Sequence, residues 1–134
     1  MALLMRIPDY IRDARYSPGG RDPSSGLDCW GLYRELRRAN GMAVPPPHPV
    51  PDGVSCADVV MGERDGGDWV PVSVTRTGDL AVWTRDGGRV HCGFVVDGRT
   101  VIHMSLHGMS LSRTDRMSAY GELETYRYIG EDHL

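Results

Sequence analysis

Between residues 29 and 40, apolar side chains recur at intervals of three and four residues. They are Leu32, Tyr33, Leu36 and Ala39. This spacing predicts an amphipathic helix that starts at Cys29 and runs to about Asn40. Asp28 is a suitable N-cap before it, and Gly41 is a typical residue for ending a helix. The sequence therefore places Cys29 in the first turn of a helix.

The segments on either side of this helix are interrupted by proline and glycine. Residues 6–15 are expected to form a short helix after Pro8, followed by a glycine-rich loop up to Asp28. The proline-rich segment 45–51 predicts an extended, polyproline-like connector. We expect a further short helix over residues 55–62, before the Gly66-Gly67 pair.

From Val70 onward, β-branched and aromatic residues predict strands. The expected ranges are 70–74, 79–84, a strand through His91, a return strand through His103, 109–113 and 124–129. Helices first and a meandering antiparallel sheet afterwards predict an α+β fold.

Two apolar runs flank Asp97-Gly98 and predict a β-hairpin. A two-residue turn at Asp97-Gly98 would place His91 and His103 on opposite faces. A three-residue loop, Asp97-Gly98-Arg99, pairs Gly93 with His103 and puts both histidines on one face as diagonal neighbours. We adopt the three-residue loop.

Cys29, His91 and His103 together form a candidate catalytic set. The first turn of a helix has unpaired N–H groups and the positive end of the dipole, so we expect it to lower the pKa of a thiol there. Cys29 is the candidate nucleophile, His91 the base, and His103 the group that orients His91. An inert buried thiol and two structural histidines are the alternative for each residue alone.

The order of several motifs resembles one peptidase family. Tyr16 precedes Gly19-Gly20, then come Gly26-Leu27-Asp28-Cys29-Trp30-Gly31-Leu32, Gly78-Asp79-Leu80, His91-Cys92-Gly93 and Ile102-His103. This order is similar to that of the NlpC family of papain-like cysteine peptidases, over roughly residues 10 to 129. Asp-Cys-Trp-Gly-Leu, together with Asp68-Trp69-Val70-Pro71-Val72, resembles the branch found in tailed phages and gene transfer agents.

The resemblance implies a papain-like fold, in which N-terminal helices carry the nucleophile and pack on an antiparallel sheet. It also implies a cell-wall hydrolase that cleaves amide bonds of peptidoglycan stem peptides by acyl transfer. The backbone N–H of Cys29 would hold the oxyanion, with the Tyr16 hydroxyl as a second donor. Asp28 matches an acid that is sometimes near a substrate amine, although a capping role is the stronger interpretation. Trp30 stands where many members have a small hydroxyl residue, so it would enlarge a substrate subsite.

Composition narrows these expectations. With 134 residues we expect one domain, 1–134, and the net charge of −3 argues against a nucleic-acid partner. The apolar start is cut short by Arg6 and Pro8, so we expect neither a signal peptide nor a membrane span. The expected location is the virion tail tip, with synthesis in the host cytoplasm and action at the host cell wall or periplasm.

No cofactor or metal is predicted. Cys29, His91, Cys92 and His103 have the composition of a zinc site, but His91 and Cys92 are adjacent on a strand and point to opposite faces. Peptidoglycan peptides and phage tail proteins are the expected partners. Two other functions remain open: a structural or assembly component of the tail tip, and a peptidase that processes a tail protein.

Overall fold

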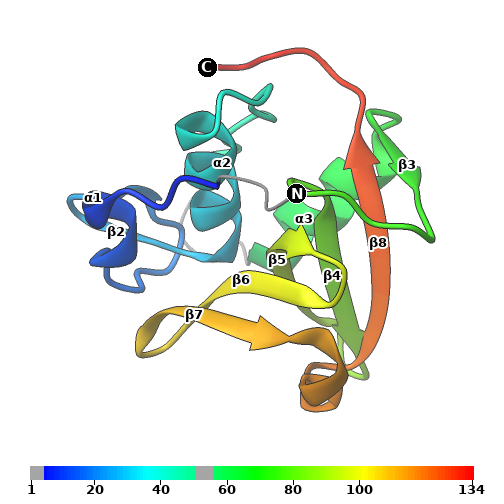
Figure 1. Cartoon of the computed structure of the whole chain (residues 1–134). Helices are drawn as coiled ribbons and strands as arrows, with labels where there is room; N and C mark the ends of the chain where they lie inside the picture. The colour runs from blue at the N-terminus through cyan, green and yellow to red at the C-terminus, as the bar shows by residue number, and fades with distance from the viewer. Residues whose placement is uncertain (1–4, 51–55) are drawn as a thin grey trace.

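The computed structural model describes residues 5–50 and 56–134 (Figure 1). In order along the chain, its elements are α1 (Asp9–Arg12), β1 (Arg21–Asp22), β2 (Gly26–Leu27), α2 (Cys29–Ala39), α3 (Cys56–Asp65), β3 (Trp69–Pro71), β4 (Leu80–Arg85), β5 (Arg89–Asp97), β6 (Thr100–Ser105), β7 (Gly108–Arg113), the 3₁₀ turns η1 (Thr114–Arg116) and η2 (Ser118–Tyr120), and β8 (Glu122–Tyr128).

A six-stranded sheet forms the framework, with the order β3-β8-β4-β5-β6-β7. Every neighbouring pair in it is antiparallel. Helix α2 packs against β5 and β6, and α3 packs against β5 (Figure 1). The α+β fold predicted from the order of the patterns is confirmed, because the helices precede the sheet and cover it.

Helix α2 has the caps that the sequence predicts. The Asp28 side chain accepts a hydrogen bond from the backbone N–H of Gly31 at 2.8 Å. Gly41 lies just beyond the C-terminal end with a φ of 68°, in the left-handed region that favours glycine. Leu32, Tyr33 and Leu36 are buried on the face toward the sheet. Capping and packing thus fix the start of α2 at Cys29.

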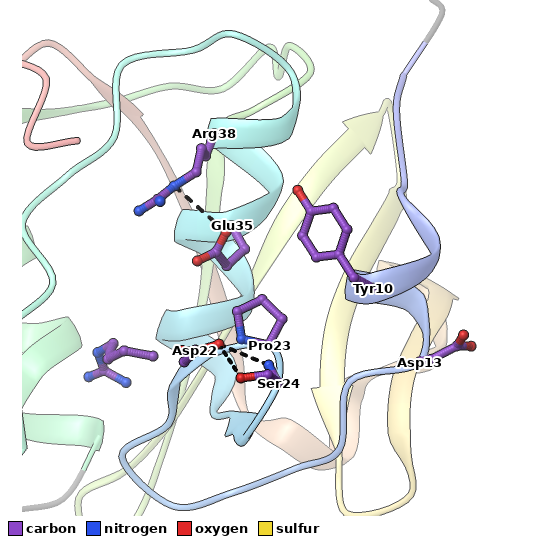
Figure 2. A pocket seen from close by; sticks show the side chains of 8 residues that line it. Tyr10, Asp13, Asp22, Pro23, Ser24, Glu35 and Arg38 are labelled. Atoms are coloured by element: carbon purple, nitrogen blue, oxygen red, sulfur yellow. Dashed lines mark hydrogen bonds and ion pairs between the residues drawn. The ribbon is translucent and has the colours of Figure 1, made fainter.

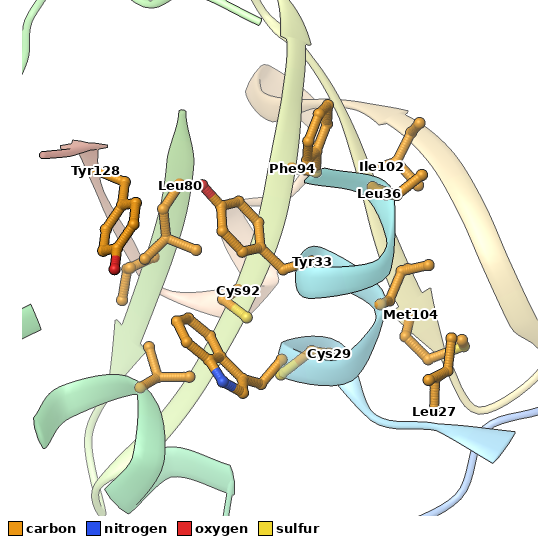
Figure 3. Packing of buried hydrophobic residues seen from close by; sticks show 14 of the residues in the cluster. Leu27, Cys29, Tyr33, Leu36, Leu80, Cys92, Phe94, Ile102, Met104 and Tyr128 are labelled. Atoms are coloured by element: carbon orange, nitrogen blue, oxygen red, sulfur yellow. The ribbon is translucent and has the colours of Figure 1, made fainter. Parts of the chain in front are cut away.

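The main core lies between α2, α3 and the sheet (Figure 3). Aromatic rings fill much of it: Tyr33 is 5.7 Å from the Phe94 ring and 5.9 Å from the Trp69 ring, between centroids. The Tyr33 hydroxyl donates to the carbonyl of Gly78 at 2.5 Å. Since a buried hydroxyl needs a partner, this bond ties the helix to the start of β4.

The hairpin register agrees with the prediction, but the loop does not. Gly93 pairs with His103, as expected from the three-residue loop. At the tip, however, Asp97 pairs with Thr100, and Val96 is left as a β-bulge. Because the bulge at Val96 takes up one extra residue in β5, the pairing from Val95 back to Gly93 is the one that a three-residue loop predicts. His91 and His103 therefore still lie on one face.

Other boundaries differ from the expected ones. Helix α1 is shorter than residues 6–15. It has a single turn, in which Ile11 is buried and Tyr10 is 54% exposed. Strand β3 ends at Pro71, which cannot donate to a ladder. The two-residue strands β1 and β2 and the turns η1 and η2 were not predicted. Residues 51 and 55, at the ends of two predicted segments, lie outside the described part of the chain.

Candidate active site

Cys29 is the first residue of α2, as predicted, but its thiol lies among other cysteines. Its Sγ is 3.2 Å from the Sγ of Cys56, the first residue of α3. Figure 3 shows Cys29 and Cys92 in the packed layer between α2 and β5. The three thiols of the chain therefore meet where two helices begin.

The sequence predicted a lowered pKa for the Cys29 thiol, and this prediction is wrong, because the surroundings of the thiol raise its pKa. The hydrogen bond with Cys56 lowers the pKa, but hydrogen bonding to Cys92, burial and the charge of Asp28 raise it. The net pKa lies well above that of an ordinary thiol. The surroundings of Cys29 therefore favour the protonated thiol over the thiolate.

The two histidines are brought together as the hairpin parity predicts. His91 Nε2 lies 2.9 Å from His103 Nδ1, and His103 Nε2 lies 3.0 Å from the hydroxyl of Ser112 on β7. Ser112 pairs with Val101, so it is the diagonal neighbour of His103. Sequence reasoning missed Ser112, although the predicted strand 109–113 contained it.

Aromatic rings enclose the histidine pair. Tyr120 stacks on His91 with centroids 4.5 Å apart, and Trp83 lies 5.7 Å from the same ring. Burial, with a smaller effect of His103, lowers the pKa of His91 to about 4. Burial also lowers the pKa of His103. Both rings are thus neutral at neutral pH.

The thiol and the imidazole are not hydrogen-bonded to each other. Cys29 contacts Cys92, which directly follows His91 on β5, but among the described residues no hydrogen bond joins Cys29 to His91 or to His103. The Cys92 side chain faces α2, whereas the His91 ring packs with Trp83 and Tyr120. The structure therefore brings the two histidines together and leaves the thiol engaged with Cys56.

Tyr16 lies beside the start of α2. Its backbone forms a bridge with Leu27, two residues before Cys29. Burial raises the pKa of its hydroxyl, with smaller increases from the nearby ionisable groups of Cys29 and Asp28. The side chain is 38% exposed, so a neutral phenol is presented to solvent next to Cys29.

Asp28 is buried and held by Arg21. Its Oδ1 accepts from Arg21 at 2.6 Å as well as from the Gly31 N–H. Arg21 also donates to the carbonyls of Pro47 and His48, which anchors the proline-rich connector. The capping interpretation of Asp28 is confirmed. Arg21 was missed because its partner is seven residues away across an irregular loop.

The expectation that Trp30 lines a substrate subsite is wrong. Its side chain is fully buried, stacks on Tyr33 with centroids 5.7 Å apart, and donates from Nε1 to the carbonyl of Pro46 at 3.0 Å. The residue after Cys29 points into the core because α2 directs its apolar face toward the sheet. Trp30 therefore stabilises the connector and does not contact solvent.

An open groove lies outside this cluster (Figure 2). It has a volume of about 630 Å³ between α1, the β1–β2 turn and α2. Its charged lining includes Glu35 and Arg38, which form an ion pair at 3.7 Å, and Arg21. Neither Cys29 nor a histidine lines the groove, but Arg21 connects it to Asp28.

Within residues 5–50 and 56–134, no group of three or more His, Cys, Asp or Glu side chains is arranged to hold a metal ion. In the same ranges no helix is both long and apolar enough to cross a membrane.

The cap at Asp28 gives a stability prediction. Asp28→Ala removes the acceptor for Gly31 and leaves Arg21 without its carboxylate, so we expect a loss of about 3 kcal/mol in the free energy of unfolding. Asp28→Asn keeps a capping oxygen and should lose about half as much. Urea unfolding of the two variants measures this. A loss below about 1 kcal/mol for alanine would contradict the assigned cap and ion pair.

Comparisons with known proteins complete the description. The sequence model of the NlpC/P60 family matches residues 13–128. Twelve chains of solved structures match the fold. One of them, described as the crystal structure of the NlpC/p60 domain of peptidoglycan hydrolase SagA, has a TM-score of 0.55 and 24% sequence identity, covering 86% of this chain and 87% of that chain. No curated protein sequence matches.

Proposed function

Because the chain belongs to the NlpC/P60 family, a family of cysteine peptidases, we propose that it hydrolyses amide bonds in peptidoglycan stem peptides. The observation that carries this proposal is the set of side chains within the matched region. A cysteine begins a helix, and a hydrogen-bonded histidine pair lies on β5 and β6, the two strands that this helix packs against. The peptidoglycan substrate is supported by the similar fold of a domain from a peptidoglycan hydrolase.

The proposed role of His91 as base requires a particular protonation pattern of the histidine pair. For His91 to act as base through Nδ1, its Nε2 must carry hydrogen and donate to His103 Nδ1. His103 then carries hydrogen on Nε2 and donates to the Ser112 hydroxyl oxygen. With these tautomers, the contacts with Ser112 and His103 leave Nδ1 of His91 free to accept a proton.

The reaction proceeds from a neutral pair. Since burial favours both the thiol and the neutral imidazole, His91 removes the Cys29 proton as sulfur attacks the amide carbonyl. This step requires the thiol to leave Cys56 and turn toward His91. The backbone N–H of Cys29 and the Tyr16 hydroxyl then stabilise the oxyanion. His91 protonates the leaving amine, and water activated by His91 hydrolyses the thioester.

The proposed setting is a phage tail or a gene transfer agent, with all of residues 1–134 forming the catalytic domain. The motif Asp28-Cys29-Trp30-Gly31-Leu32 supports this branch. The enzyme would travel at the tail tip and act on the host wall. Processing of a tail protein is the competing role, and size analysis of tail proteins made with and without Cys29 separates the two.

Incubation with purified muropeptides under reducing conditions tests the activity. The unmodified protein should release new free amines, and Cys29→Ala should not. If the unmodified protein released none, a structural role at the tail tip would replace the proposed activity.

The lowered pKa of His91 predicts an unusual pH profile. Only the neutral imidazole accepts the proton of Cys29. We therefore expect kcat/KM to stay constant as the pH is lowered from neutral to about 6, and to reach half of that value near pH 4. Circular dichroism at each pH would show that the protein stays folded. An acid limb near 6.5, the ordinary histidine value, would contradict the burial of His91 in the active form.

A further inference from the structure

Cys56 is the residue that the proposed mechanism leaves without a role. It begins α3, and its Sγ lies 3.2 Å from the Sγ of the candidate nucleophile. A disulfide would need the two sulfurs to approach by about 1.2 Å more. Cys56 is half-buried and more exposed than Cys29, so this pair can be reached by a small oxidant from the Cys56 side.

The position of Cys92 makes it the poorer partner for Cys29. Cys92 is fully buried and belongs to β5, which is held between β4 and β6 by antiparallel ladders. Cys56 instead is the first residue of α3, outside the sheet. Only the contact with Cys56 joins two thiols that each start a helix, outside the strand ladders that hold Cys92.

We propose that Cys29 and Cys56 form a reversible disulfide that switches the peptidase off under peroxide and is reopened by thiol reductants. The inference of the disulfide rests on the sulfur contact alone, and only its effect on activity rests on the proposed function. Cys29 is the oxidised thiol, and Cys56 is the resolving thiol that protects it from further oxidation.

The chemistry balances with hydrogen peroxide as oxidant. As the Cys29 sulfur attacks one peroxide oxygen, its thiol proton is released, the O–O bond breaks, and the departing hydroxide takes up that proton as water, leaving a sulfenic acid. The Cys56 thiol then attacks this sulfur, so the S–S bond forms and the S–O bond breaks. The second hydroxide leaves with the Cys56 proton as water. Two thiols lose two electrons, and one peroxide becomes two waters.

Non-reducing peptide mapping of the full chain after peroxide treatment tests the disulfide directly. We expect a peptide pair joined through Cys29 and Cys56, lighter than the two free peptides by two hydrogens. Absence of this pair, or a pair joined through Cys29 and Cys92, would overturn the proposal. The readout needs no catalysis, so the disulfide can be found even if the protein hydrolyses no stem peptide.

Activity measurements test the switch. Peroxide should lower hydrolysis by the unmodified protein at least tenfold, and dithiothreitol should restore it. Cys56→Ala should be active when reduced but should not recover after peroxide, because an unresolved sulfenic acid oxidises further. Cys92→Ala is the matched control and should recover as the unmodified protein does. Full recovery of Cys56→Ala would refute the resolving role.

Discussion

Cys29→Ala is expected to lower kcat/KM for a stem peptide by roughly 10⁴- to 10⁶-fold, because the variant has no atom that can form the thioester. Cys29 lies at the start of α2, where its backbone N–H remains to bind the carbonyl oxygen. Substrate affinity should therefore change much less than turnover. Kinetics on a defined peptide, with binding of the uncleaved peptide measured in parallel, separate the two effects.

Cys56→Ala and Cys92→Ala are the matched controls for this loss. Each removes one thiol from the same cluster and leaves the nucleophile in place. We expect both to retain activity within about tenfold when reduced, with Cys92→Ala the less stable because it creates a small cavity in the core. If either control lost as much activity as Cys29→Ala, another cysteine would have to be the nucleophile.

His91→Ala should have the second largest effect, a fall in kcat of roughly 10³- to 10⁴-fold. Its imidazole is both the base for the thiol and the acid for the leaving amine. His103→Asn should cost less, roughly 10- to 100-fold, because His103 acts by orienting His91. Steady-state kinetics at several pH values measure both losses.

The pH profile distinguishes a positioning role for His103 from a merely structural one. His103 contributes to lowering the pKa of His91, so His103→Asn should move the acid limb upward from about 4. Ser112→Ala should leave that limb near its original position while lowering kcat, since it affects only the tautomer of His103. An unchanged limb in His103→Asn together with wild-type kcat would remove His103 from the catalytic set.

The sequence was sufficient for features that depend on local periodicity. The spacing of Leu32, Tyr33 and Leu36 predicted α2, and Asp28 and Gly41 set its ends. Parity along the hairpin placed His91 and His103 on one face, because the side-chain period of a strand is two. The predicted loop length was wrong, but the predicted register was still correct because the bulge at Val96 takes up one extra residue.

Features that depend on distant contacts could not be read from the sequence. The expectation that Trp30 lines a substrate subsite came from the small hydroxyl residue that many family members have at this position, but burial against Tyr33 and a bond to Pro46 fix it in the core. Cys56 carried no pattern that pointed to Cys29, since the two lie in separate helices. The pKa of Cys29 depends on how deeply the thiol is packed, which helix position alone does not determine.

The central claim is that Cys29 cleaves an amide bond of a peptidoglycan stem peptide. Mass spectrometry of a defined stem peptide after incubation with the reduced protein tests it most directly. The account predicts two fragments whose masses together equal the peptide plus one water, and none with Cys29→Ala. An intact peptide with the unmodified protein, or the same fragments with Cys29→Ala, would contradict it.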